Sequence, residues 1–409
     1  MRRFVFLGFL FLAVLPAFPQ EPLSVSDTVV LDEIVSYGSL RKYQAGSKIE
    51  SIGGEAFSLS KGVDLEQLLA KTLPIAFKAD AGGLSTIRIR GTGSSHTSVN
   101  FGGIDLNSLT LGQSNFSNVP VYLFDNVGVQ FGSASSVNGS GSIGGAVHLG
   151  LNHNWTNGFR AEARLSHGSF GEQLYGTKLF AGNGKFESVT RAYYYYKTND
   201  FPFLNNTYRD FENQIFEKED VQRNASLEHY GVLQELNYRL EPGEYFFANV
   251  WLERDRRQNQ QNMQTNLNNP DYSEEYLDEH IRIWTGYKNH KNKLKYEVNG
   301  GYVSDNAVNN GNTADTIATR RWIAEVLVEH VLSATTSYKA GAKAMRITPT
   351  VYAYESSLDH EDRVDIYASF YQRIYSTLSA TLNLRQGFVS NYKVPFTPSL
   401  GLSWQALSG

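Results

Sequence analysis

The sequence predicts a compact α+β domain followed by an antiparallel transmembrane β-barrel. The composition is rich in Tyr (24), Phe (24) and Gly (36) and has no Cys, which suits extended structure because aromatic side chains fit a half-buried pleated surface. Before residue 152 the elements are short and rich in small residues, whereas after it apolar and polar residues alternate over long stretches. An export signal at the N-terminus sends both parts out of the cytoplasm.

Residues 1–20 have the layout of a secretory signal peptide. The basic pair Arg2–Arg3 precedes the apolar run Phe4–Leu15, and small or helix-breaking residues follow. A membrane anchor is disfavoured because the run has 12 residues, whereas a spanning helix needs ~20. We therefore expect cleavage between Ala17 and Gln20.

Composition also excludes several classes of function. The formal net charge of -4 gives no case for nucleic acid, whose binding proteins usually show a basic face. The absence of Cys excludes disulfides and thiolate chemistry. Neither G-x-S-x-G nor H-E-x-x-H occurs, so we expect no catalytic residues, no cofactor and no enzyme. Acidic clusters at 271–280 and 359–363 could bind calcium through carboxylate oxygens, but they lack EF-hand spacing and are interpreted as solvated loop charge, with no metal site.

One helix is clearly signalled in the upstream domain, within "VDLEQLLAKTLP". Asp64 is placed as N-cap with Gln67 at N3, so that the two satisfy each other's backbone donors as a capping box. Val63 and Leu68 occupy the hydrophobic staple positions, and Pro74 ends the helix. Three short strands with glycines follow, in "STIRIRG", "TSVNFGGIDLN" and "VGVQFG".

The run "GSGSIGG" contains a literal G-x-G-x-x-G at Gly139, Gly141 and Gly144. A dinucleotide-binding loop of this form must open a helix whose N-terminus meets the pyrophosphate. Here Gly144 and Gly145 lead into "AVHLGL", which alternates as a strand. We interpret the glycines as a tight turn that needs positive φ and close packing.

The downstream segment alternates with a period of two over about a dozen stretches. The clearest are "FRAEARLSH", "YFFANVWLER", "KLKYEVNGGYV" and "SLGLSWQAL"; weaker ones lie near 174–182, 185–197, 231–240, 281–287, 338–346, 365–374 and 377–389. A soluble sandwich or propeller also alternates, but its strands run ~5–6 residues, whereas membrane barrels need ~9–11 with an apolar outer face. Stretches of nine or more residues, a charged polar face and aromatic strand ends favour the barrel. Short links such as "GNGK" (182–185) and long polar ones, 198–228 and 255–277, fit its two edges.

Three upstream runs occur in order between residues 32 and 150: "LEQLLAKTLPIAFKADAGGLSTIRIRG", "SVNFGGIDLN" and "NVPVYLFDNVGVQFGSASSVNGSGSIGGAVHL". Together they resemble the plug domain of TonB-dependent outer-membrane receptors. The resemblance implies a signal peptide (1–20), an energy-coupling segment (21–40), a plug (41–152) and a barrel of the 22-stranded type (153–409). It also implies a Gram-negative outer-membrane location, contact with membrane lipid, the TonB energy-transducing protein as partner, and a metal chelate as ligand.

The resemblance gives candidate functional residues. A TonB box is implied in one of two overlapping segments, "DTVVLDE" (27–33) or "LDEIVSYGS" (31–39), because an extended apolar-polar segment suits strand addition to a partner's sheet edge. The candidate residues are Asp32, Glu33, Ile34, Val35 and Ser36, and the alternative is that they form only the first strand of the plug. The ligand is expected to be a cobalamin or a ferric siderophore, with "NDFPFLNN" favouring the vitamin B12 receptors. By position alone, the ligand-binding candidates are His96, Asn100, Asn115 and Phe116.

Departures from the family pattern affect the plug. Arg90 and Gly91 match an arginine that the family pairs with barrel glutamates, but Phe131 precedes Gly132 where a second Arg-Gly is usual. Gly102–Gly103 replaces the usual Asp-Gly, and His148 is expected to be a solvated strand histidine rather than a metal ligand.

About 250 residues follow residue 158, which is room for roughly a dozen strands rather than 22. An unclosed sheet in lipid leaves edges unpaired, so we expect a truncated copy of a longer transporter. The alternative function is a secreted β-rich adhesin or structural protein, which would share the signal peptide and strands but not the ordered plug segments.

Overall fold

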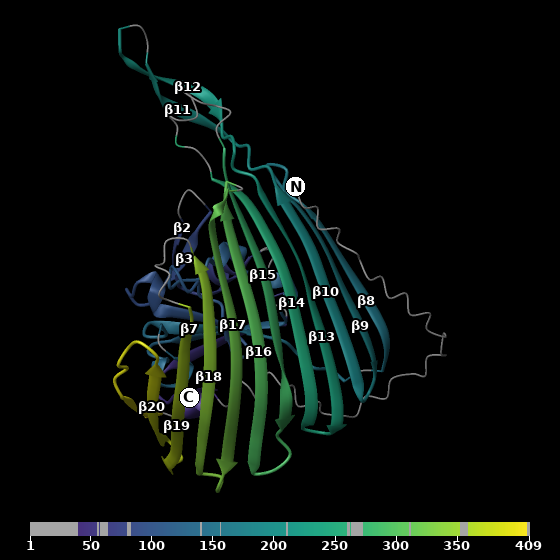
Figure 1. Cartoon of the computed structure of the whole chain (residues 1–409), viewed down its shortest axis with the longest axis vertical. Helices are drawn as coiled ribbons and strands as arrows, with labels where there is room; N and C mark the ends of the chain where they lie inside the picture. Colours follow the sequence, from purple (N-terminus) through teal and green to yellow (C-terminus); the bar gives the residue numbers. More distant parts are fainter. Residues whose placement is uncertain are drawn as a thin grey trace. The chain divides into compact units, whose positions relative to one another are not determined.

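The computed structural model describes residues 40–54, 57, 64–79, 83–139, 141–155, 157–209, 212–259, 262, 273–310, 312–351 and 359–406. The predicted signal peptide, the candidate TonB box Asp32–Ser36 and the staple residue Val63 lie outside these residues. The described residues all belong to one compact unit, Leu31–Gly409. They form a small mixed α/β body, called the plug below, and a large antiparallel sheet, called the wall (Figure 1).

The plug is built on a five-stranded sheet with the order β1-β6-β7-β4-β5. Its strands are β1 (Lys48–Gly53), β4 (Thr97–Phe101), β5 (Ile104–Asp105), β6 (Asn126–Phe131) and β7 (Gly145–Gly150). β4 and β7 pair in parallel, and the other neighbours pair antiparallel. The remaining plug elements are α3 (Leu65–Thr72), β2 (Ala76–Ala79), β3 (Ser85–Arg88), η1 (Ser94–His96), η2 (Phe116–Asn118), η3 (Val121–Leu123) and α4 (Ser135–Asn138).

Helix α3 begins and ends where the sequence predicts. Asp64 is the N-cap, and its Oδ1 accepts a hydrogen bond of 2.9 Å from the backbone N–H of Gln67. The reciprocal hydrogen bond of the predicted capping box, from the backbone N–H of Asp64 to the Gln67 side chain, is replaced by another contact. The Gln67 side-chain amide donates to Asp64 Oδ2 at 3.0 Å, so this half of the prediction was wrong. Leu65, Leu68 and Leu69 form the buried face of the helix, which stops before Pro74.

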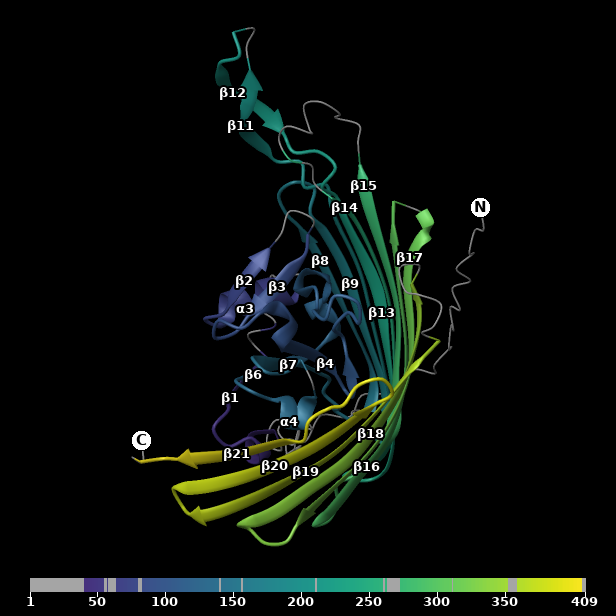
Figure 2. The same ribbon diagram turned by 60° about the vertical axis from the view of Figure 1, so that its left-hand side comes forward.

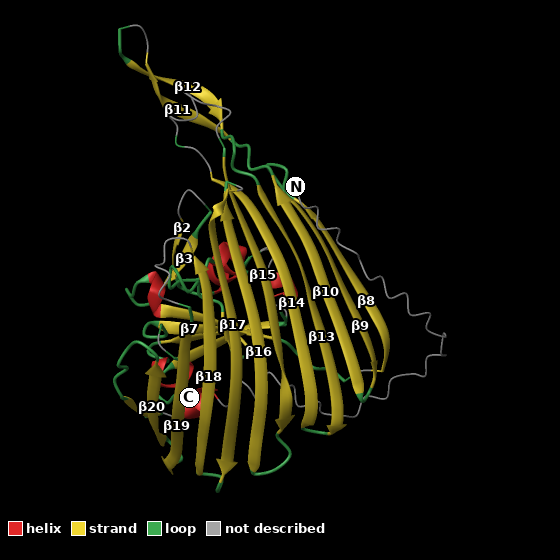
Figure 3. Cartoon of the chain, in the orientation of Figure 1, coloured by secondary structure: helices red, strands yellow, loops and turns green. Residues whose placement is uncertain are grey.

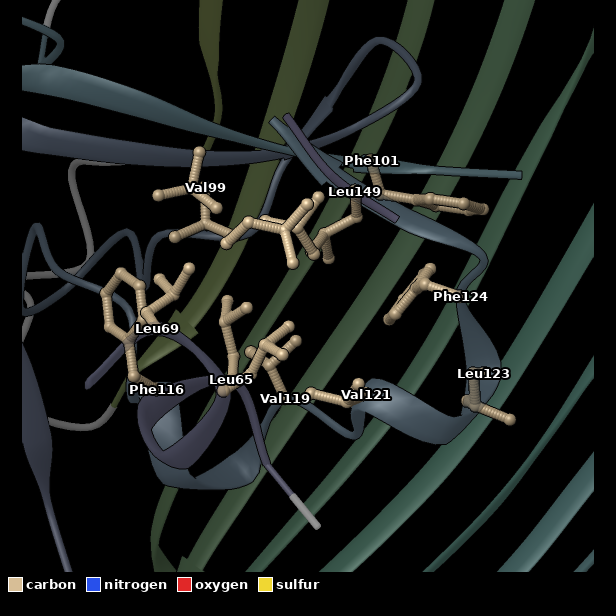
Figure 4. Packing of buried hydrophobic residues seen from close by; sticks show 14 of the residues in the cluster. Leu65, Leu69, Val99, Phe101, Phe116, Val119, Val121, Leu123, Phe124 and Leu149 are labelled. Carbon is tan, nitrogen blue, oxygen red and sulfur yellow. The ribbon is translucent and has the colours of Figure 1, made fainter. Parts of the chain in front are cut away.

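The plug core lies between α3 and the five-stranded sheet. Leu65 and Leu69 of the helix face Val99, Phe101 and Leu149 of the sheet across this core (Figure 4). Phe116, Leu123 and Phe124 close it, each at 1% exposure or less. Burying a side chain of this size contributes about 1.5–3 kcal/mol, so the plug has an apolar core of its own.

The wall is a sheet of twelve strands within the described residues, joined in the order β21-β20-β19-β18-β17-β16-β15-β14-β13-β10-β9-β8 (Figure 3). Every neighbouring pair is antiparallel. The strands are β8 (Asn157–His167), β9 (Gln173–Asn183), β10 (Phe186–Lys197), β13 (Leu227–Glu241), β14 (Glu244–Asn259), β15 (Glu274–Asn289), β16 (Leu294–Asn309), β17 (Asn312–Val331), β18 (Thr336–Val351), β19 (Glu361–Tyr375), β20 (Leu378–Val389) and β21 (Thr397–Trp404). All but β21 have 11 to 20 residues, which is too long for an ordinary sandwich strand.

The two edges of the wall differ in their links, as expected for a membrane barrel. One edge, called the short-turn edge, has links of two to four residues at 184–185, 242–243, 290–293, 332–335 and 376–377. The opposite long-loop edge includes 198–226, which was expected to be a loop. Instead a separate two-stranded sheet projects there, formed by β11 (Pro202–Arg209) and β12 (Ile215–Val221) (Figure 1).

One further expectation about the wall was wrong, and one strand was missed. The region 255–277 was expected to be a loop, but β14 and β15 remain paired as far as Asn259 and Glu274. Charged residues there face both sides of the sheet and form the pair Arg256–Glu275 at 2.7 Å, so no apolar alternation marked the strands. Strand β17 was not predicted, because it shows no clear alternation in the sequence. Its inner face carries Ile323 and Leu327 among the glutamates.

The outer face of the wall is an apolar band between two aromatic rows. Directly opposed Tyr175, Tyr194 and Tyr230 form one row, and Tyr238, Phe246 and Tyr287 form the other. The eight residue steps from Tyr230 to Tyr238 span about 27 Å along β13 before any tilt. That distance matches the band of ~25 Å, flanked by aromatic girdles, that lipid-exposed barrels carry. No helix among the described residues is long and apolar enough to cross a membrane.

The plug elements lie on the concave face of the wall (Figure 2). In this view α3, β2 and β3 lie toward the end from which β11 and β12 project, and β1 and α4 lie toward the opposite end. The plug therefore has one side near the long-loop edge and another near the short-turn edge.

Leu236 of β13, 42% exposed, lies within the apolar band, two residues from Tyr238, whereas Leu240 lies beyond the row formed by Tyr238, Phe246 and Tyr287. We expect Leu236→Arg in the full-length protein to lower the free energy of unfolding from lipid vesicles by about 1–3 kcal/mol, and Leu240→Arg by about 0–1 kcal/mol. Denaturant titration of the reconstituted protein measures both. Equal costs for the two arginines would contradict the assignment of this face to lipid.

Candidate functional site

The plug and the wall share a hydrophobic cluster centred on a tryptophan of the wall. Trp251 of β14 is fully buried and makes edge-to-face contacts with two plug rings, Phe101 at 5.6 Å and Phe124 at 5.3 Å between ring centroids. The Arg282 guanidinium lies 4.1 Å from the centroid of the same indole. Aromatic pairs of this geometry contribute about 0.5–1.5 kcal/mol beyond the area that they bury. The plug core thus continues into the wall.

A second tryptophan packs against the glycine turn between β4 and β5. A Cβ added at Gly102 or Gly103 would collide with the Trp284 indole, and a Cβ at Gly301 of β16 would meet it from the wall side. Ile104, the next plug residue, is fully buried in a cluster with wall residues Tyr245, Phe247, Val303 and Ile323. The Gly102–Gly103 pair, a departure from the family pattern, therefore has a physical reason, because side chains there would expel the indole.

Cations of the wall bind backbone carbonyls of the plug. Arg321 donates to the carbonyl of Asp105 at 2.7 Å, and Lys343 donates to the carbonyl of Gly103 at 2.5 Å. Arg385 donates to the carbonyl of Ser135 at 2.9 Å. These bonds satisfy loop carbonyls that would otherwise be desolvated between the two bodies, and charged donors make them stronger than neutral pairs.

A buried charged contact between plug and wall has the opposite polarity to the one that the family resemblance implies for Arg90. The plug supplies a carboxylate, Asp125, and the wall supplies Arg191, which lies 2.6 Å away and is fully buried. Arg191 also pairs with the buried Glu235. The expected pair of Arg90 with a wall glutamate is not formed within the described residues. Arg90 is exposed, with φ of 52°, and its guanidinium lies beside Gly132 of the plug itself.

The glycines of "GSGSIGG" divide into two roles. Gly139 and Gly141 have φ of 104° and 92°, a left-handed region that favours glycine. Gly144 and Gly145 are needed for close approach, since a Cβ on the first would strike Thr92 and on the second the carbonyl of Gln130. Gly145 begins strand β7, so the dinucleotide reading fails for lack of a following helix.

A cavity of about 190 Å³, called the upper cavity, lies between the plug and the long-loop edge of the wall. It is lined from the plug by Asp64, Ser85 and Asn118 and from the wall by Tyr193, Tyr195 and His229. The wall residues stand at the end of β10 and the start of β13, on either side of the projecting β11–β12 sheet. Ser85 Oγ is buried and has no hydrogen-bond partner among the described residues, so a hydroxyl is available in this region.

A larger cavity of about 600 Å³, called the lower cavity, lies between the plug and strands β14 to β21. Cations and carboxylates alternate on its wall side, for example Lys295 with Glu329 at 3.5 Å and Arg385 with Asp365 at 2.7 Å. Such a lining holds water readily and leaves few cations without a counter-charge. No group of three or more His, Asp or Glu side chains arranged to hold a metal ion occurs in the described part of the chain.

The four ligand-binding candidates do not lie together. Asn100 lines the lower cavity, and His96 accepts a hydrogen bond from the backbone of Gly93 at 3.2 Å. Asn115 is committed to the plug, accepting from the backbone of Ser85 at 2.9 Å and donating to the carbonyl of Gly83. Phe116 is 1% exposed in the plug core, so its ring is closed to a ligand in this conformation.

Sequence reasoning missed the upper-cavity residues of the wall. Tyr193, Tyr195 and His229 all lie on the polar side of alternating strands, the side that faces the plug. In the sequence, the "YYYY" run appeared only as aromatic enrichment at a strand end. The alternation could have assigned Tyr193 and Tyr195 to the inner face, but pairing of β10 with β13 across the long loop was needed to bring His229 beside them.

Burial shifts the pKa values of two plug residues in opposite directions. It lowers the pKa of His148 on β7 to about 4, so the imidazole is neutral at pH 7. It raises the pKa of Asp64 to about 6, against the opposing effect of the hydrogen bond from Gln67. His148 lies on a strand and lines the lower cavity, and its side chain is half-buried rather than fully solvated.

Substitution of Gly103 tests the glycine-tryptophan contact. We expect Gly103→Ala to lower the free energy of unfolding by about 1–3 kcal/mol through overpacking against Trp284. Gly93→Ala is the matched control, since a Cβ there meets only His96 at 3.6 Å. Combining Gly103→Ala with Trp284→Leu should cost less than the sum of the single changes, whereas additivity in a denaturant double-mutant cycle would contradict the contact.

Acidification tests the burial of His148. A histidine in the unfolded chain takes up its proton near pH 6.5, whereas folded His148 does so near pH 4. Its stabilising contribution is therefore complete above pH 6.5 and is lost as pH falls toward 4, by up to about 3 kcal/mol. Hydrogen exchange of the β6 and β7 amides measures the free energy of unfolding. The difference in this free energy between wild type and His148→Gln should change between pH 6.5 and pH 4. A constant difference would refute the shift, and comparing the two proteins cancels the opposite contribution of Asp64.

The comparisons with known proteins agree with this architecture. Residues 41–146 match the family model of the TonB-dependent receptor plug domain. A 112-residue segment is 30% identical to the vitamin B12 transporter BtuB of Vibrio vulnificus, and the match covers 25% of this chain and 18% of that protein.

Solved structures extend the similarity to plug and wall together. A mutant of the ferric enterobactin receptor PfeA from Pseudomonas aeruginosa superimposes with a TM-score of 0.67 at 13% identity, over 90% of this chain and 61% of the receptor. The iron transporter FrpB from Neisseria meningitidis gives 0.69 at 14% identity, over 89% and 63%. The chain thus spans less than two thirds of these receptors' length, and the likeness shows the fold. Residues 41–146 thus form a plug domain of the TonB-dependent receptor type, and plug and wall together have the fold of these outer-membrane receptors.

Proposed function

We propose that the chain is the plug and part of the barrel of an outer-membrane receptor that takes up a scarce metal chelate, either a cobalamin or a ferric siderophore. The observation that carries this proposal is the plug's packing onto the charged inner face of a sheet whose outer face is apolar. A protein in this arrangement closes a passage through the membrane and must rearrange to open it. We further propose that the chain is a truncated copy of a longer transporter.

The upper cavity is the proposed entry site for part of the ligand. It lies at the long-loop edge, which faces outward in barrels of this type. Its Tyr193 and Tyr195 rings, Asp64 and the hydroxyl of Ser85 combine apolar surface with a few polar groups, the usual make-up of a small-molecule site. At about 190 Å³ it would hold one portion of a chelate, with the loops above supplying further contacts. Of the candidates predicted from the sequence, His96 and Asn100 remain proposed contacts of the ligand. They would meet it after it has left the upper cavity.

Energy coupling is proposed for the segment before the plug. Residues 32–36 end four positions before the first described residue, Leu40, and residues 42 and 43 contact the wall close to its short-turn edge. The short-turn edge faces the periplasm in bacterial barrels, where an inner-membrane partner could reach this segment. The TonB energy-transducing protein would bind it by strand addition and pull. Transport in this scheme is conformational and needs no catalytic residue.

The choice between ligands rests on relatives that differ. One relative carries the name vitamin B12 transporter, others are ferric enterobactin and siderophore receptors, and another is the copper transporter OprC. The 112-residue match to the vitamin B12 transporter agrees with the cobalamin preference drawn from "NDFPFLNN". Cobalamin is therefore the first probe to test.

Cells that lack their own receptors and express the full-length gene should bind radiolabelled cobalamin or a radiolabelled ferric siderophore saturably. We expect Tyr195→Ala to weaken binding by about tenfold, because a lost ring contact of this kind costs about 1–2 kcal/mol. Tyr238→Ala removes a tyrosine from the outer face of the same sheet and should leave affinity unchanged. Failure of both probes to bind would refute the chelate proposal, and equal affinity of the two variants would refute the cavity.

A further inference from the structure

We propose that Tyr43 and its partners on the wall form a mechanical latch, which must open before a pull on the N-terminal segment reaches the plug sheet. The latch is defined by Lys42 and Tyr43 of the plug and Glu329 and Ser337 of the wall. It rests on the proposed function only for the identity of the pulling partner.

The phenol of Tyr43 is the centre of the latch. Tyr43 is 2% exposed, and its hydroxyl lies 3.1 Å from Glu329 Oε1 and 2.9 Å from Ser337 Oγ. A phenol has one proton, so it donates to the carboxylate and accepts from the serine hydroxyl. Hydrogen bonds to an ionised carboxylate are roughly twice as strong as neutral ones, and this bond is closed to water.

Glu329 is held in place by two cations. Lys42 Nζ lies 3.3 Å from Oε1, and Lys295 Nζ of β16 lies 3.5 Å from Oε2. Lys42 also lies 5.6 Å from the ring centroid of Tyr371 on β19. A buried carboxylate needs such pairing, so Glu329 is kept charged and oriented toward Tyr43.

The backbone beside Tyr43 is fastened to the same part of the wall. Asn383 of β20 donates to the carbonyl of Tyr43 at 3.1 Å. Gly401 of β21 approaches the carbonyl of Ala45 so closely that a Cβ there would collide with it. Residues 42 to 45 therefore contact strands from β17 to β21, all close to the short-turn edge.

The latch lies between the proposed coupling segment and the first strand of the plug. A pull applied at residues 32–36 travels along the chain to Tyr43 before it reaches β1 at Lys48. While the latch is closed the wall takes up the force. Once it opens, the force acts on β1, an edge strand that pairs with β6 alone among the described strands.

The latch consists of polar bonds, in contrast to the aromatic contacts of Trp251 and Trp284. Each polar bond acts over a short distance and breaks singly, whereas the buried rings must lose a whole apolar contact area. The latch is thus built to yield first, and the plug turn held by Trp284 is built to remain on the wall.

A thiol reporter tests the latch without any partner. Gln44→Cys introduces a thiol into a segment of 409 residues that has none, at a side chain that is 5% exposed. In the full-length protein in membranes, this thiol should react slowly with a maleimide. Tyr43→Phe keeps the ring and removes the hydroxyl, and we expect it to raise the reaction rate about tenfold or more. Tyr338→Phe is the matched control, because this tyrosine bonds His330 at 3.1 Å on the outer face of the strand that carries Ser337.

A pulling measurement tests the mechanical role. With a handle at the N-terminus of the full-length protein in a bilayer, the first rupture should occur at lower force in Tyr43→Phe than in wild type or Tyr338→Phe. Equal maleimide rates and equal first-rupture forces in Tyr43→Phe and wild type would overturn the latch. Neither measurement uses a chelate or TonB, so failure of the proposed function would leave these results unchanged, and failure of the latch would leave chelate uptake standing.

Discussion

The structure depends on the insertion of two wall tryptophans into the plug. Trp251 completes the plug's own hydrophobic core, and Trp284 occupies a slot that exists because Gly102, Gly103 and Gly301 have no side chains. These contacts fix the plug on the inner face of the wall, so every polar contact around them acts between surfaces already in register. The cations that bind plug carbonyls, and the Asp125–Arg191 pair, follow from this placement.

The two faces of the wall have different surroundings, which explains the long alternation of apolar and polar residues along its strands. Leu236 and Leu252 are exposed on the outer face, while Arg191, Glu253 and Arg321 on the opposite face are buried in separate ion pairs. A charge can be retained inside because it is paired or bonded to the plug, and the same charge outside would be unsupported. The inner face is consequently both the seat of the plug and the lining of the cavities.

The architecture was largely predictable, and the contacts were not. Period-two alternation identified most wall strands, and the capping signal of Asp64 and the stop at Pro74 located α3. The alternation failed to predict β17, whose inner face carries apolar residues, and the long-loop ends of β14 and β15, where charged residues lie on both faces. The site depends on residues far apart in sequence, such as Tyr43 with Glu329, or Tyr195 with His229, and a single sequence does not contain that pairing. The resemblance to plug domains gave an arginine lock at Arg90, whereas this chain uses Asp125 as the plug partner.

Plug and wall form one continuous hydrophobic core. A double-mutant cycle between Phe101 of the plug and Trp251 of the wall, each replaced by Leu in the full-length protein, measures this most directly. Their rings meet edge to face at 5.6 Å. We expect a coupling free energy of about 0.5–1.5 kcal/mol between Phe101 and Trp251. Additive effects of the two changes on the free energy of unfolding would show that the plug does not pack on this part of the wall.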